Sequence, residues 1–153
     1  MQFLTYAPRL RCAALTAMAG GAVAQTMSLW GGHLARFLPP MAVMMGAGAV
    51  GAGIAGLILA DAFGRAGRRG AFCALLGWPI ATLLGAVIGA TLVVIEAMEL
   101  SAATLAHAVS EGAPFGIMAL MDGISTSPAV AGIWLLSGWA MHVGARVERR
   151  ATI

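Results

Sequence analysis

The stretch from Ala71 to Ile95 reads AFCALLGWPIATLLGAVIGATLVVI and contains no charged residue. The stretch from Pro40 to Ala60, a short connector earlier, reads PMAVMMGAGAVGAGIAGLILA and is also uncharged. A helix needs roughly 20 apolar residues to cross the hydrocarbon core of a bilayer, which is about 30 Å thick. These two runs therefore predict two transmembrane helices that follow each other as a hairpin.

Two weaker apolar runs lie on either side of this hairpin. Residues Cys12 to Trp30 are diluted by several hydroxyl and amide side chains, and residues Pro128 to Val143 form a short run. Ser127 followed by Pro128 favours a helix start there, because Ser is a good N-cap residue and Pro suits the first helical position. The alternative is a start near Phe115, which would place Asp122 inside the span.

These four runs predict the fold class. We expect an all-α protein, a polytopic integral membrane protein with a bundle of about four transmembrane helices in a single domain of residues 1–153. The segment from Glu96 to Glu111 reads EAMELSAATLAHAVSE and places polar residues roughly along one helical side. We interpret it as an amphipathic segment between the third and fourth spans, either an extension of the third span or an interfacial helix.

The composition excludes other classes of protein. Residues of the set AVILMFWYC make up 60% of the chain, a further 21 residues are Gly, and only nine basic and six acidic residues are present. A soluble domain of this size needs far more surface charge, and a disordered chain needs far fewer apolar residues. The Arg residues form short clusters between apolar runs, so we expect no nucleic-acid partner.

The charged residues also predict an orientation. Eight of the nine Arg residues fall on one side of a four-span arrangement: Arg9, Arg11, Arg65, Arg68, Arg69, Arg146, Arg149 and Arg150. Cytoplasmic segments carry an excess of Lys and Arg, so both termini are expected in the cytoplasm. The chain has neither Lys nor Asn, a compositional habit of GC-rich bacterial genomes, so we expect a bacterial inner membrane. The opposite side carries Arg36 and four of the six acidic residues.

The N-terminal segment permits a second interpretation. Residues 1–24 combine Arg9 and Arg11 with an apolar stretch and with small residues at Ala22 and Ala24, which is the pattern of a secretory signal peptide. Cleavage after Ala24 would leave three spans with the same orientation. Charge therefore does not separate the two interpretations, whereas the intact mass of the protein would.

Small residues recur every four positions on the two central spans. The predicted helix-packing residues are Gly48, Ala52 and Gly56 on the second span, with Ala60 continuing the series, and Gly77, Ala81, Gly85 and Gly89 on the third. Such faces let helix backbones approach closely in a membrane. We expect the two faces to pack against each other, with a partner protein as the alternative occupant of either face.

The polar residues near the outer side suggest a possible ion path. Intramembrane carboxylates are costly and usually functional, so Glu96, Glu99, His107 and Asp122 are the candidates. No pattern of catalytic residues, metal ligands or Walker A residues occurs. The second span matches G-x-G-x-x-G without a surrounding strand–helix unit. We therefore predict no catalytic residues, no metal and no cofactor, although His33 with His107 is a conceivable haem ligand pair.

Two functions remain as hypotheses. The first is a non-catalytic accessory, assembly or structural subunit of a larger membrane complex, with the lipid bilayer and other membrane subunits, or a second copy, as partners. It rests on the lack of a catalytic constellation and on the number of small-residue faces. The alternative is a small transporter or channel component whose acidic residues line a path for an ion or small solute.

Overall fold

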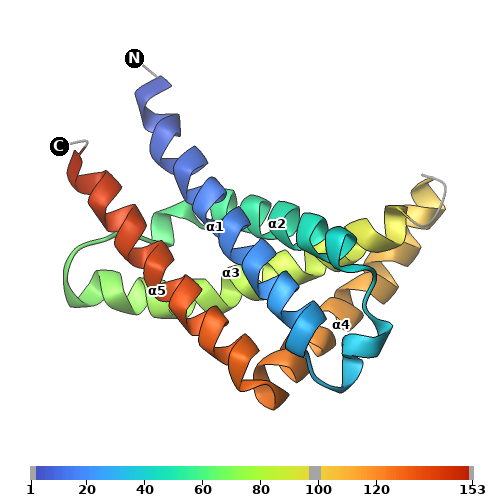
Figure 1. Ribbon diagram of the computed structural model, residues 1–153. Coiled ribbons are helices and arrows are strands. Elements are labelled where there is room, and N and C mark those ends of the chain that lie inside the picture. The colour runs from blue at the N-terminus through green and yellow to red at the C-terminus, as the bar shows by residue number, and fades with distance from the viewer. Residues whose placement is uncertain (1–2, 97–100, 152–153) are drawn as a thin grey trace.

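The computed structural model describes residues 3–96 and 101–151 and is all-helical, as predicted, with no strand in this part of the chain (Figure 1). The elements are α1 (Phe3–Trp30), η1 (His33–Phe37), α2 (Met41–Ile58), η2 (Ala60–Ala62), α3 (Gly67–Glu96), α4 (Ala102–Thr126) and α5 (Pro128–Ala151). Each α-helix carries apolar runs, and Pro79 in α3 and Pro114 in α4 are internal prolines, which lack the N–H of a regular helical residue.

Three helices are long and apolar enough to cross a membrane by themselves. The qualifying segments are Arg9–Trp30 of α1, Met41–Ile58 of α2 and Gly67–Glu96 of α3. The helices α4 and α5 qualify only together, as a pair bent by 106°. The chain therefore has three such helices, or four crossings if the bent pair counts as one broken span.

The bend between α4 and α5 lies at Ser127. The Ser127 N–H donates to the Gly123 carbonyl at the end of α4, and its hydroxyl accepts from the Val130 N–H at 3.4 Å in α5. Pro128 opens α5 at a position where the missing N–H costs little. Phe115 and Asp122 thus lie inside α4, and the next helix begins at Pro128.

The helix α4 contains the later part of the segment that was expected to be amphipathic. It packs along α3 through Gly112 and Gly116: a methyl group added at Gly112 would lie 3.0 Å from the Thr91 backbone. Its outward side is mixed, because His107 is exposed as well as Leu105. The close approach at the two glycines determines which side of α4 is buried.

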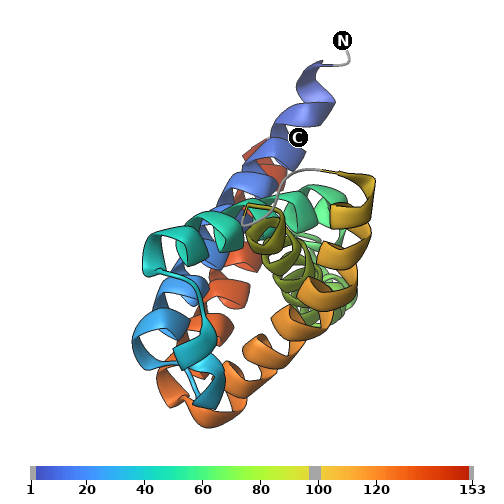
Figure 2. The same ribbon diagram turned by 90° about the vertical axis from the view of Figure 1, so that its right-hand side faces the viewer.

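The helices pack in sequence, α1 on α2, α2 on α3 and α3 on α4, while α5 returns along α1 (Figures 1 and 2). One end of the bundle gathers the N-terminal part of α1, η2 and the C-terminal part of α5. Arg9 forms an ion pair with Asp61 at 2.8 Å, and a methyl group at Gly64, whose φ is +74°, would lie 2.5 Å from the Ala145 carbonyl oxygen.

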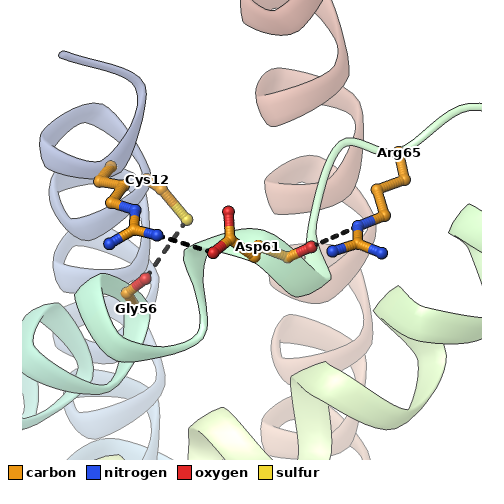
Figure 3. A network of polar contacts seen from close by, with 5 residues as sticks. Cys12, Gly56, Asp61 and Arg65 are labelled. Carbon is orange, nitrogen blue, oxygen red and sulfur yellow. Dashed lines mark hydrogen bonds and ion pairs between the residues drawn. The ribbon is translucent and has the colours of Figure 1, made fainter. Parts of the chain in front are cut away.

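This end is fixed by a buried aromatic residue and a small polar network. Phe63 is fully buried in a cluster with Trp78 and Met141. The Cys12 thiol donates to the Gly56 carbonyl at 3.5 Å, and the Arg65 guanidinium donates to the Asp61 carbonyl at 2.7 Å (Figure 3). The three Arg-rich segments therefore lie at the same end of the bundle.

Candidate functional site

The small residues of α2 face α1 rather than only α3. A methyl group added at Gly48 would lie 2.7 Å from Cβ of Ala24, and one added at Gly56 would lie 2.6 Å from Cβ of Thr16. Gly20 of α1 completes this seam against Ala52 and the Gly48 backbone. We expected the small-residue face of α2 to pack directly on that of α3. In the structure α1 covers much of the α2 face instead.

The second predicted face does contact α2 along part of its length. A methyl group at Gly85 would lie 3.1 Å from Cα of Ala52, and one at Gly89 would lie 2.9 Å from the Ala47 carbonyl oxygen. Gly77 lies instead against Ala62 of η2, and Ala81 is buried beside Trp78. Because α2 lies between two helices, it needs small residues on two sides, and Gly51 supplies the side toward α3.

Three of the four residues proposed for the ion path are described by the structure, and these three are not gathered at one place. Glu96 is exposed at the end of α3, and His107 is exposed on α4. Asp122 is 15 residues further along α4 than His107, or about 22 Å at 1.5 Å per residue. Glu99 lies outside the described residues.

Asp122 has a structural contact. Its carboxylate oxygen Oδ2 accepts a hydrogen bond from the Leu34 backbone N–H at 2.8 Å, in the first turn of η1. The residue before this short helix is Gly32, which has no side chain to cap it. The Asp122 carboxylate therefore accepts a hydrogen bond from a first-turn N–H that has no partner within the short helix. Asp122 therefore connects the loop after α1 to the last turn of α4.

We expect Asp122→Ala to lower the free energy of unfolding of the purified protein by about 1–2 kcal/mol, because it removes a part-buried hydrogen bond to a charged group. Asp122→Asn keeps an acceptor oxygen and should fall between Ala and the wild type. Thermal unfolding in detergent measures both, with the exposed Glu96→Ala as the matched control. Equal losses from Glu96→Ala and Asp122→Ala would contradict this role.

A cavity of about 480 Å³ lies between α1, α2, α3 and α4. It is lined mainly by the small residues of the helix seams, together with larger apolar residues such as Val23, Met27 and Phe115. The segment Phe37–Pro39, between η1 and α2, also contributes to the lining. Its volume falls within the roughly 300–1,000 Å³ typical of small-molecule sites.

The two threonine hydroxyls of this cavity are hydrogen-bonded within the chain. The Thr16 hydroxyl donates to carbonyls of its own helix, at Cys12 and Ala13, both at 2.9 Å. The Thr82 hydroxyl donates to the Trp78 carbonyl at 2.7 Å. Of the described lining residues, Glu111 alone carries a charge, and it is exposed.

Two tryptophans and Thr82 form a closed hydrogen-bonded network between α3 and α5, beside the cavity. The Trp78 indole N–H donates to the Trp134 carbonyl at 3.0 Å, and the Trp134 indole N–H donates to the Thr82 hydroxyl at 3.0 Å. The two ring centroids are 6.4 Å apart. Sequence reasoning did not identify this pairing, because the two tryptophans are 56 residues apart in the chain.

No group of three or more His, Cys, Asp and Glu side chains that could hold a metal ion occurs in the described part of the chain. The arrangement thus offers an apolar chamber with one charged group among its described lining residues. The chain matches no protein-family model, no curated protein and no solved structure.

Proposed function

We propose that the protein is a multi-pass protein of a bacterial inner membrane with both termini in the cytoplasm. The position of the Arg residues supports this orientation. The Arg9–Asp61 ion pair joins α1 to η2, and Gly64, in the connector between η2 and α3, packs on Ala145 of α5. The three Arg-rich segments lie at the same end of the bundle. Cytoplasmic segments of membrane proteins carry an excess of positive charge, so this end is assigned to the cytoplasm.

We infer that the protein is a small non-catalytic accessory or assembly subunit of a larger membrane complex. The observation that carries this proposal is an exposed apolar ridge on α5, which we define as Leu135, Leu136, Trp139, Val143 and Val147. Leu136, Trp139, Val143 and Val147 recur three or four positions apart, and Leu135 is four positions before Trp139, so all five lie along one side of the helix.

Trp139 is the largest side chain of this ridge. It is 68% exposed and lies four residues before Val143, where the apolar run of α5 ends. Tryptophan is enriched at membrane interfaces, and it is also among the residues that dominate protein interfaces. We assign the ridge to contact with a transmembrane helix of a partner subunit.

The small-residue faces have a different role in this proposal. Gly48 and Gly56 are covered by α1, Gly85 and Gly89 by α2, and Gly116 by α3. Faces that are covered inside the chain are not available to a partner. The partner contact therefore falls on the large apolar side chains of α5.

The test is Trp139→Ala in the native membrane. We expect the tagged variant to lose co-purification with its complex, and its band in a native gel to move to lower mass. Trp30→Ala is the matched control, because Trp30 is 59% exposed but lies at the end of α1. Retention of the complex by Trp139→Ala, or equal loss in both variants, would contradict the proposal. A complex that contains only this chain would identify the partner as a second copy.

The cavity favours a second candidate function, a small transporter or channel component. The cavity's apolar lining, with Glu111 as the one charged residue among those described, would form part of a path for a small apolar or amphipathic solute, whereas an ion would pass by acidic residues outside it. Within this proposal Glu96 and Asp122 remain candidates as well. The variants described for Asp122 also test it: loss of ion flux into vesicles at unchanged thermal stability would favour transport over the accessory role.

A further inference from the structure

The cavity between α1, α2, α3 and α4 is long rather than round. Its lining on α3 extends from Trp78 to Val94, sixteen helical steps of 1.5 Å that cover about 24 Å. A sphere of the same 480 Å³ would be only about 10 Å across. A chamber of this shape suits an extended chain better than a compact solute.

The chemistry of the walls excludes a polar occupant for most of this length. The walls are almost entirely Gly, Ala, Val, Met and Phe side chains, and the hydroxyls of Thr16 and Thr82 donate to backbone carbonyls of their own helices. Polar groups buried there would lose hydrogen bonds to water without replacement. Large apolar cavities are costly when empty and bind apolar molecules readily.

The one charge among the described lining residues is that of Glu111. Glu111 of α4 is exposed, and Val94 lies near the C-terminal end of α3, from which the chain leads to α4. Of the lining residues on α1 and α3, Thr16 and Trp78 are those nearest the Arg-rich end, close to the middle of their helices. A ligand that is apolar along its length and polar at one end would place its head near Glu111 and its tail near Trp78.

We propose that this cavity binds one hydrocarbon chain of a membrane lipid, with the polar head near Glu111 and the chain end near Trp78. The surrounding bilayer supplies such chains at high concentration. This site is independent of the partner-binding ridge on α5, whose residues do not line the cavity. The shared chemistry of the ligand is a long hydrocarbon chain, carried either by an acyl lipid or by an isoprenoid lipid.

The first experiment uses fluorescence of the cavity tryptophan. Trp30 and Trp139, which are both exposed, are replaced by Phe in the full chain, so that Trp78 and Trp134 remain. Phospholipids with bromine at a defined position of the acyl chain are titrated into the protein in detergent. We expect saturable quenching that is at least twofold stronger for bromine near the chain end than for bromine near the head.

Variants that fill the cavity sharpen this test. Ala86→Phe and Val94→Phe place a ring in the lining at two depths, and each should reduce the saturable quenching at least fivefold. Ala71→Phe is the matched control, because Ala71 is exposed on the same helix α3. Circular dichroism establishes whether each variant is folded. If one of the two cavity variants misfolds, the other still tests the proposal.

The second experiment identifies which class of lipid carries the bound hydrocarbon chain. Native mass spectrometry of the purified protein should show one bound lipid that is absent from Ala86→Phe and present in Ala71→Phe. The mass of the released lipid distinguishes a phospholipid from an isoprenoid. Quenching that is not saturable, or that is unchanged in both cavity variants while they are folded, overturns the proposal. So does a bound helix of another protein in place of a lipid.

Discussion

Replacing Gly51 with Leu is expected to separate α2 from α3 and to unfold the protein at temperatures where the wild type is stable. A methyl group added at Gly51 would meet the Gly85 carbonyl oxygen and would lie 2.8 Å from the Gly89 backbone nitrogen. These atoms belong to the backbone of α3, so no side chain can rotate away. We expect a loss at or above the about 1–3 kcal/mol that overpacking typically costs.

The same helix offers a matched control. Gly46 has nothing within 4 Å of an added methyl group, and it is exposed. Gly46→Leu should be neutral or slightly stabilising, because Gly is about 1 kcal/mol less favourable than good helix formers. The two variants carry an identical change in α2 and differ only in what lies opposite.

The Cys12 thiol provides the measurement. It is 4% exposed and donates to the Gly56 carbonyl of α2, so its reaction with a maleimide reports the opening of the bundle. In a Cys73→Ser background, Gly51→Leu should accelerate this reaction at least tenfold and lower the unfolding temperature in detergent. Equal rates for Gly51→Leu and Gly46→Leu would show that α2 and α3 do not approach as closely as the structure indicates.

The difference between these two glycines also shows where sequence reasoning stops. Hydropathy located α2 and α3 correctly, because an apolar run of this length without a charged residue is typical of a membrane-spanning helix. A four-residue spacing selected Gly48 and Gly56 as packing residues, but spacing does not state which helix they meet. The answer depends on α1, whose apolar run is weaker and whose Gly20 was not singled out.

Asp122 illustrates the same limit for the polar residues. A carboxylate within an apolar sequence suggested an ion path, whereas the structure gives it a backbone N–H of Leu34, 88 residues away, as a partner. Such long-range contacts leave no periodic trace in the sequence. The cavity was not predicted for the same reason, because it is formed by gaps between four helices rather than by a motif within one.

Replacing Trp78 with Ala is expected to have the second large effect, about 3–5 kcal/mol of lost stability. Trp78 is only 7% exposed, it packs on Gly138 of α5, and its N–H donates to the Trp134 carbonyl. The substitution therefore creates a cavity and also removes a contact between α3 and α5. Trp78→Phe keeps most of the ring and loses mainly the hydrogen bond, worth about 0.6–1.7 kcal/mol in membrane proteins.

Trp139→Ala is the matched control for this prediction, because it deletes the same side chain from an exposed position of α5. In the isolated protein it should change the unfolding temperature little, although the native complex should be lost. The order of unfolding temperatures in detergent should be Trp139→Ala highest, then Trp78→Phe, then Trp78→Ala. If Trp139→Ala were as damaging as Trp78→Ala, the α5 ridge would contribute to the fold itself rather than to a partner, and the two roles assigned to tryptophan would have to be exchanged.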